Sequence, residues 1–167
     1  MKGNYNKDRT CCFTGHRVIP NEAKESLSLK VKDAVLEMYE RGYRTFVGGG
    51  AIGFDTLAEL TVIGLRSVYD DMKLVLAVPC ANQDERWNFT QRAVYERVKK
   101  ACDEVIVLHD THTPGCMHER NDLMVDMSSA CIAFYSGHPG GTRYTVEKCR
   151  DNGLYVVNLF ENKKQTE

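Results

Sequence analysis

Short apolar runs alternate along the chain with longer stretches in which apolar residues recur every three or four positions. The short runs predict buried strands, and the longer stretches predict helices with one apolar face. A helix is predicted after each of the first five strands, because an amphipathic stretch follows each of them. The predicted strands are residues 10–14, 45–47, 73–79, 103–108, 130–135 and 154–160.

Helix ends are predicted from the residues that flank the amphipathic stretches. Gly42 follows the apolar face that runs from Leu27 to Met38, in a position where glycine commonly ends a helix. Asn82, with Glu85 three residues later, predicts the start of the third helix, because this spacing fits a capping asparagine partnered by an acidic residue. The last two helices are predicted over residues 117–127 and 142–152.

The alternation of strands and helices predicts an α/β fold. Strands that are apolar on both sides must be covered on both faces, and helical crossovers make neighbouring strands parallel. We therefore expect a doubly wound, mainly parallel six-stranded sheet with helices on both faces. No linker or repeat interrupts the sequence, so residues 1–167 are expected to form one domain, with loose termini at residues 1–9 and 161–167.

Glycines gather in the loops that follow the second and fifth predicted strands. Doubly wound sheets bind ligands outside the carboxyl ends of their strands, where these loops lie. Glycine lets a ligand approach backbone NH groups, and the helix that follows presents its positive end. The loops therefore predict a phosphate site, although tight strand-to-helix turns would use the same residues. The glycines are Gly48, Gly49, Gly50 and Gly53 in one loop and Gly140 and Gly141 in the other, with Gly15 after the first strand.

The loop from Gly48 to Gly53 also matches the dinucleotide-binding fingerprint. That fingerprint needs an acidic residue at the end of the following strand to hold the ribose hydroxyls. Asp70 and Asp71 fall before that strand instead, and the strand ends at Pro79. A hydride-transferring dehydrogenase is therefore disfavoured.

Polar residues beside these glycines are candidates for ligand contacts. His16 and Arg17 follow the first strand and would supply positive charge to a phosphate. Asp55 begins the second helix, where it either caps the helix or accepts hydrogen bonds from ligand hydroxyls. Arg120 and Asn121, near the start of the fourth helix, suit a sugar phosphate.

The histidines and the cysteine between residues 109 and 118 are crowded enough to raise the question of a zinc site. Their spacing matches none of the strong zinc patterns, so no metal site is predicted. Trp87, the only tryptophan, is predicted one turn into the third helix, where it either covers an aromatic base or packs in the core. We expect no required cofactor, only a nucleotide-type ligand.

Composition narrows the classes of partner. The 22 basic and 23 acidic side chains leave a net charge of −1, without any basic run, so a nucleic-acid partner is not expected. No stretch approaches the roughly 18 apolar residues of a membrane span. Residues 1–10 hold no apolar run that would act as a secretion signal, so we expect no membrane partner and a location in the cytoplasm. Seven cysteines, an odd number, indicate reduced core thiols rather than a disulfide framework.

Several separated motifs cover nearly the whole chain: residues 12–17 (CFTGHR), 48–58 (GGGAIGFDTLA), 78–80 (VPC) with Gln83 and Trp87, 120–126, and 140–142 (GGT). Together they resemble the YpsA-type proteins of the SLOG superfamily, which is named for DNA-processing protein A and the "lonely guy" phosphoribohydrolases. The resemblance implies a Rossmann-like sheet that binds nucleotide-derived ligands, in a family connected with bacterial cell division. It also implies association into a homodimer.

The resemblance raises an enzymatic alternative. Residues 117–120 are similar to the phosphoribohydrolase motif whose arginine is catalytic, which would give this role to Arg120. That family has an essential glutamate three residues after the threonine of its glycine motif, where this chain has Thr145, with Glu147 two residues further on. The offset means that Glu147 should point elsewhere. The catalytic acid would then be a displaced one, with Asp55, Glu119 and Glu147 as the candidates.

We therefore expect a sensor or regulator that binds an AMP-like, ADP-ribose-like or NAD-derived ligand through its glycine-rich strand-end loops. One alternative is an enzyme that cleaves the N-glycosidic bond of nucleoside monophosphates. Another is a single-stranded DNA-binding protein similar to DNA-processing protein A. The expected ligand contacts are Gly15, His16, Arg17, Gly48, Gly49, Gly50, Gly53, Asp55, Arg120, Asn121, Gly140, Gly141 and Thr142.

Overall fold

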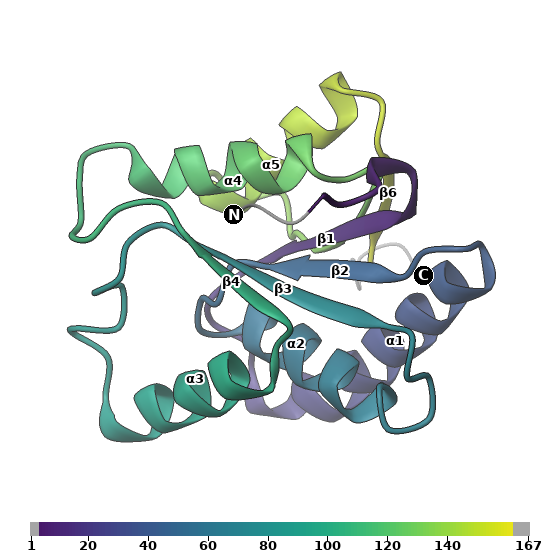
Figure 1. Ribbon diagram of the computed structural model, residues 1–167, viewed down its shortest axis with the longest axis horizontal. Coiled ribbons are helices and arrows are strands. Elements are labelled where there is room, and N and C mark those ends of the chain that lie inside the picture. The colour runs from purple at the N-terminus through teal and green to yellow at the C-terminus, as the bar shows by residue number, and fades with distance from the viewer. Residues whose placement is uncertain (1–3, 162–167) are drawn as a thin grey trace, which may run out of the picture.

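Six parallel strands form one sheet with helices on both faces, as the sequence predicts (Figure 1). The computed structural model describes residues 4–161. The strands are β1 (Thr10–Gly15), β2 (Thr45–Gly48), β3 (Lys73–Val78), β4 (Glu104–Val107), β5 (Ala130–Phe134) and β6 (Tyr155–Asn158). The helices are the 3-10 helix η1 (Lys7–Arg9) and the α-helices α1 (Asn21–Glu40), α2 (Phe54–Leu65), α3 (Phe89–Ala101), α4 (Cys116–Asp126) and α5 (Gly141–Asp151). None of the helices in residues 4–161 combines the length and the apolar character that a bilayer crossing requires.

The order of the strands across the sheet is β4-β3-β2-β1-β5-β6. The chain starts near the centre with β1, moves outward to β4, and then returns to place β5 on the other side of β1. The winding therefore reverses between β1 and β5. In open sheets of this kind, ligands bind in the crevice at such a reversal.

Alternate residues of β1 point into two separate hydrophobic cores. Cys11 and Phe13 pack with residues of α1, α2 and α3, whereas Cys12 packs with residues of α4 and α5. Figure 1 shows the same division, with α1, α2 and α3 below the sheet and α4 and α5 above it. Because β1 is paired on both sides and buried on both faces, it holds the loop that follows it in a fixed position.

The helix after β3 begins later than the sequence predicts. Residues 82–87 form turns, and α3 begins at Phe89. The cap is Asn88: its side chain accepts a hydrogen bond from the backbone NH of Gln91, and the Gln91 side chain accepts one from the backbone NH of Asn88. This reciprocal pair satisfies two NH groups and so sets the helix start. The predicted cap at Asn82 is wrong for this reason.

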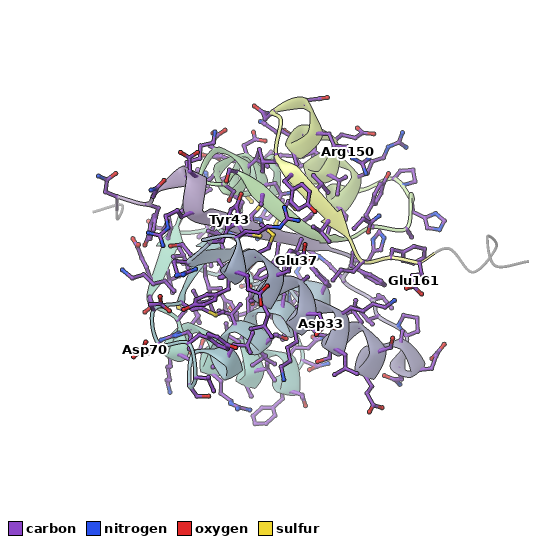
Figure 2. All side chains as sticks on the ribbon, turned by 90° about the vertical axis from the view of Figure 1, so that its right-hand side faces the viewer. Asp33, Glu37, Tyr43, Asp70, Arg150 and Glu161 are labelled. Atoms are coloured by element: carbon purple, nitrogen blue, oxygen red, sulfur yellow. The ribbon has the colours of Figure 1, made fainter. Side chains whose placement is uncertain are left out.

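The start of the chain is more ordered than expected. Lys7–Arg9 forms η1, and the Arg9 side chain donates from Nε to the carbonyl oxygen of Gly42 at 2.9 Å. This contact holds residues 7–9, which the sequence predicts to be part of a loose terminus, against the end of α1. At the other end, Glu161, labelled in Figure 2, pairs with Lys30 of α1 at 2.9 Å. Residues 4–6 of the predicted loose termini are described and form no helix or strand, whereas residues 1–3 and 162–167 lie outside the described residues.

Candidate functional site

A cavity of about 410 Å³ opens at the point where the winding of the sheet reverses. It lies at the ends of β1 and β5 and at the starts of α4 and α5, which is where the topology predicts a ligand. Folding brings together there segments that are far apart in the sequence. The lining comes from residues 13–17, 51, 55, 117, 118, 120, 121, 124 and 138–142.

Both helices that begin at the cavity have a glycine before their first turn. Gly115 precedes α4 and Gly140 precedes α5, and no side chain caps either helix. The first NH groups of a helix have no partner within it, and the dipole makes this end positive. The uncapped start of α5 therefore leaves the NH donors of Gly141 and Thr142 at the wall of the cavity.

The glycine loop after β2 surrounds two carboxylates of the protein itself. Asp55 and Glu59 lie one turn apart on α2 and are only 7% and 1% exposed. The backbone NH of Gly50 donates to Glu59 Oε2 at 2.9 Å, and Gly49 and Ala51 give backbone hydrogen bonds to Asp55. The loop therefore holds two side-chain carboxyl groups of α2 in the place where the sequence predicts a ligand.

Arg120 extends from α4 to this same loop and is 5% exposed. Its Nη1 donates to the carbonyl oxygen of Gly49 at 2.6 Å, and its Nε donates to Asn121 Oδ1 at 2.8 Å. Within residues 4–161, Nη2 reaches only the sulfur of Met117, at 3.8 Å. Because a thioether is a weak acceptor, Nη2 remains available to an anion in the cavity.

Burial determines the protonation of these three side chains. It raises the pKa of Asp55 to about 6, although the Arg120 guanidinium and backbone hydrogen bonds act in the opposite direction. It also raises the pKa of Glu59 well above its usual value, and the neighbouring Asp55 carboxylate adds to this rise. Burial lowers the pKa of Arg120, which still carries its charge at pH 7. Asp55 thus titrates near pH 6 at the wall of the cavity.

His16 is a neutral link between two loops rather than a source of positive charge. The backbone NH of Ser136 donates to His16 Nε2 at 2.8 Å, so this nitrogen carries no proton. Burial, with a smaller contribution from His138, lowers the pKa of His16. The expected charge at His16 is therefore wrong, and Arg17 supplies the positive charge on this side of the cavity.

The structure divides the predicted ligand contacts into two groups. The glycines from Gly48 to Gly53 do not line the cavity, because their loop packs against side chains of α2. A Cβ atom at Gly48 would collide with the Glu59 carboxylate, and one at Gly53 would collide with the backbone of Arg17. The predicted contacts that do line the cavity are Gly15, His16, Arg17, Asp55, Arg120, Asn121, Gly140, Gly141 and Thr142.

Of the three candidate catalytic acids, only Asp55 lines the cavity. Glu119 is exposed, and its Oε2 lies 2.7 Å from Nε2 of His109. Glu147 pairs with Arg143 at 2.9 Å on the exposed side of α5, in agreement with its offset from the position that the family motif requires. Neither Glu119 nor Glu147 lines this cavity.

Sequence reasoning missed Glu59 and several lining residues. Glu59 stands four residues after Asp55, so a helical spacing places both carboxylates on one face of α2. His138 lies in the same loop as Gly140, and Met117 precedes Arg120 by one turn of α4. Closer attention to neighbours of the predicted contacts would have found them.

A second cavity of about 570 Å³ adjoins the first, since Arg17 and Met117 line both. Trp87 lines this second cavity and packs against Tyr95, with 5.2 Å between the ring centroids. It precedes α3 instead of lying one turn into it, because the helix starts at Phe89. Trp87 is therefore partly accessible beside the site.

Comparisons with known proteins agree with this architecture. The YpsA family model, described as the YspA SLOG family, matches residues 19–159. The chain is 32% identical over 138 residues to the uncharacterized SPbeta prophage-derived protein YoqJ of Bacillus subtilis strain 168, a match that covers 72% of this chain and 80% of YoqJ.

Solved structures of DNA processing protein A share the fold. The protein from Streptococcus pneumoniae superposes with a TM-score of 0.67 at 14% identity, over 95% of this chain and 53% of that one. The protein from Helicobacter pylori superposes with a TM-score of 0.66 at 16% identity, over 94% of this chain and 67% of that one. The family match spans most of the chain, and the likeness to YoqJ supports it, so this chain belongs to the YpsA family of SLOG proteins.

Proposed function

We propose that the cavity at the ends of β1 and β5 binds a nucleotide-derived ligand, with a phosphate at the start of α5. The main support is that the uncapped start of α5, Arg17 and Arg120 all open onto one cavity. NH groups at a helix start and guanidinium groups are the donors that phosphates favour. Asp55 is partly protonated near pH 6, so it repels an anion less than an ordinary carboxylate would.

The cavity also offers partners for a sugar and a base. Asp55 can accept hydrogen bonds from ribose hydroxyls, and the side-chain NH₂ of Asn121 can donate, because Asn121 Oδ1 is already occupied by Arg120. Trp87 in the adjoining cavity supplies an aromatic face for a base. The two cavities, of about 410 and 570 Å³, have the size of small-molecule sites, which supports an AMP-like, ADP-ribose-like or NAD-derived ligand.

We further propose that binding serves sensing or regulation, as the family's connection with bacterial cell division suggests, and that the protein acts as a homodimer. The first experiment is a thermal-shift panel of AMP, ADP-ribose and NAD, with mass spectrometry of ligands that co-purify. A ligand at about one hundred times its Kd should add about 2.7 kcal/mol of stability. If none of the three ligands changes the melting temperature at millimolar concentration, a protein that acts only by binding other proteins becomes the better explanation.

Thr142→Asp should remove binding of AMP or ADP-ribose without damaging the fold. Thr142 is the second residue of α5 and lines the cavity, so the new carboxylate would occupy the phosphate position. A carboxylate in the first turn stabilises a helix by about 0.3–1 kcal/mol. We expect the Kd to rise at least about tenfold in calorimetric titration, because two anions a few ångströms apart repel strongly at low dielectric.

Thr90→Asp is the matched control for this experiment. Thr90 is the second residue of α3 and lies away from the first cavity, so the variant gains the same charge at the same helix position. It should keep the affinity of the unmodified protein. Equal affinities in Thr142→Asp and Thr90→Asp would place the phosphate somewhere other than the start of α5.

A second candidate function is hydrolysis of the N-glycosidic bond of a nucleoside monophosphate. It is favoured by Asp55, the one carboxylate that lines the cavity within residues 4–161, whose pKa of about 6 suits proton transfer near neutral pH. Such a reaction needs a carboxylate that activates water or stabilises the positive charge developing on the sugar. Arg120 would then orient the phosphate or the base.

Incubation with AMP and chromatography of free adenine distinguishes the two candidates. If the protein is a hydrolase, Asp55→Asn should lower kcat by about 10²–10⁴-fold, since it removes the acid–base group but keeps the size of the side chain. Glu119→Gln should keep full activity, because Glu119 does not line the cavity. Adenine release that is equal in Asp55→Asn and the unmodified protein would exclude Asp55 as the catalytic acid.

Binding of single-stranded DNA stays a less favoured alternative. One structure with this fold, from Helicobacter pylori, is described in terms of the single-stranded DNA binding mode of DNA processing protein A. The net charge of −1 argues against a similar role here, since affinity for a nucleic-acid backbone comes mainly from basic side chains. Retention of labelled single strands that weakens with rising salt would reverse this preference.

A further inference from the structure

Three cysteines meet in the core between the sheet and α5. The Sγ atoms of Cys12, Cys131 and Cys149 all lie within 4.8 Å of one another. Each of the three residues is 0% exposed. In the sequence they are far apart and show no metal-binding spacing, which is why sequence analysis interprets them as ordinary core residues.

The backbone fixes the arrangement of these thiols. Cys12 of β1 and Cys131 of β5 are direct neighbours in the parallel register, and both point to the face that α5 covers. Cys149 completes the group from the last turn of α5. Hydrogen bonds from the thiols of Cys12 and Cys131 lower the pKa of Cys149, whereas the pKa values of Cys12 and Cys131 are raised. The backbone of β1, β5 and α5 thus brings the three sulfurs together.

The surroundings of the cluster restrict what it could bind. Within residues 4–161, no histidine or carboxylate joins the three sulfurs, and the neighbouring core residues are apolar, among them Val146 and Ala133. Structural zinc takes four protein ligands, and a zinc ion with three keeps a water, for which this dry position has no place. The set therefore fits a three-coordinate, sulfur-seeking ion.

Charge decides between ions of this kind. Three thiolates around Cu(I) would leave two negative charges in an apolar core, where an uncompensated charge is very unfavourable. Three thiolates around a trivalent centre are neutral. Metal–sulfur bonds of about 2.3 Å mean that sulfurs already within 4.8 Å of one another need to move little to share one centre.

We propose that Cys12, Cys131 and Cys149 form a binding site for a trivalent thiophilic ion of the arsenite type. In the reaction, As(OH)₃ exchanges its three hydroxyl groups for the three sulfurs. Three S–H and three As–O bonds break, three As–S bonds form, and three water molecules leave. Arsenic stays trivalent, so no oxidant or reductant takes part.

The cluster lies beneath the elements that frame the candidate site. Cys12 precedes Thr14 of the cavity wall by two residues, and Cys149 lies two turns after Gly141 on α5. Because all three thiols are fully buried, arsenite must enter while α5 is displaced from the sheet, or during folding. The test therefore includes loading of the folded protein and loading during refolding from urea.

The experiment measures arsenite uptake and identifies the thiols that hold it. The reduced protein is incubated with arsenite either in its folded state or during refolding from urea. Native mass spectrometry then measures the number of arsenic atoms bound to each chain. Alkylation in denaturant followed by peptide mapping then identifies the protected thiols. We expect one arsenic per chain, a higher melting temperature, and protection of Cys12, Cys131 and Cys149 among the seven cysteines. Cu(I) and Zn(II) in parallel samples should bind less tightly.

Single cysteine-to-alanine variants provide the controls. Cys12→Ala, Cys131→Ala and Cys149→Ala should each lose the bound arsenic, whereas Cys11→Ala should keep it. Cys11 is the matched control, because it is equally buried on β1 but points to the opposite core. The peptide map of the unmodified protein does not depend on whether these variants fold.

Three outcomes would overturn the proposal. The first is the absence of uptake even on refolding. The second is protection of Cys80 and Cys116, a second buried pair whose thiols are hydrogen-bonded to each other, in place of the three-cysteine cluster. The third is preferential retention of Zn(II) or Cu(I) over arsenite, which would contradict the charge argument. None of these outcomes depends on the nucleotide proposal.

Discussion

Arg120→Ala is expected to lower the free energy of unfolding by about 3–5 kcal/mol at pH 7, the usual cost of removing one partner from a buried group of charges. Asp55 and Glu59 would keep their burial and lose their nearest buried positive charge. The carbonyl of Gly49 would also lose a 2.6 Å hydrogen bond. This is the largest effect that we expect from a single substitution at the site.

The loss of unfolding free energy in Arg120→Ala should become smaller as the pH falls. Asp55 has a folded pKa of about 6 and an ordinary value of 3.8, so the folded state prefers the protonated form. Below pH 4, Asp55 is protonated in both the folded and the unfolded state, so it does not lower the free energy of unfolding. As the pH rises from 4 to 6, Asp55 ionises first in the unfolded state, and the free energy of unfolding falls. At about 1.4 kcal/mol for each pKa unit, the penalty of Asp55 reaches about 3 kcal/mol above pH 6. Without Arg120 the pKa of Asp55 in the folded state would rise further, so the free energy of unfolding would continue to fall above pH 6.

Urea unfolding at pH 5 and pH 7 measures this difference. Arg143→Ala is the control: Arg143 pairs with Glu147 at 2.9 Å, about half of each side chain is exposed, and such pairs are worth about 1 kcal/mol or less. Adding Asp55→Asn to Arg120→Ala should restore part of the loss at pH 7. A loss that is the same at both pH values would mean that Arg120 acts through packing, not through its charge.

Gly53→Ala and Gly64→Ala should change stability in opposite directions, although both alter the same helix region. Gly53 has a φ of 83° just before α2, and a Cβ atom there would collide with the backbone of Arg17, which cannot move aside as a flexible side chain could. Strain and overpacking together are expected to cost about 3 kcal/mol. Gly64 lies within α2 with nothing within 4 Å of an added Cβ, so alanine should add about 0.5 kcal/mol.

Thermal and urea unfolding of the two variants test this pair. The ligand titration described above adds a second readout, since the loop after β1 carries Arg17 and is packed against Gly53. Gly53→Ala should also weaken AMP or ADP-ribose binding, and Gly64→Ala should not. Near-equal stabilities of the two variants would contradict this prediction. They would mean that the loops after β1 and β2 can move apart at little cost to make room for the new methyl group.

The fold could be predicted from the sequence because its signals are local. Each apolar run is long enough to be a strand, and Gly42 ends α1 with a φ of 102° as its position indicates. The start of α3 could not be predicted reliably, because Asn82 and Asn88 are both asparagines with a suitable partner three residues later. Only the three-dimensional path of the loop after β3 decides between them.

The site was predictable to a more limited degree. The loops after β1 and β5 line one cavity, as the topology of a doubly wound sheet predicts, because it brings the ends of these strands together. The sequence predicts a ligand at the loop after β2, but the structure places carboxyl groups of the protein there. A glycine that makes room for a phosphate looks the same in the sequence as one that makes room for a carboxyl group. The burial of Glu59 could not be predicted either, because the pattern of an amphipathic helix predicts that apolar residues are the buried ones.

The position of β5 beside β1 has a consequence for the synthesis of the protein. β1 to β4 leave the ribosome first and can pair with one another in chain order, but one wall of the cavity consists of residues 138–142, which are made later. A nascent chain that ends at β4 therefore lacks one wall of the cavity, and β1 has no partner on one side until β5 is made. If the proposed phosphate site is correct, its ligand can stabilise the chain only after residues 138–142 have been added.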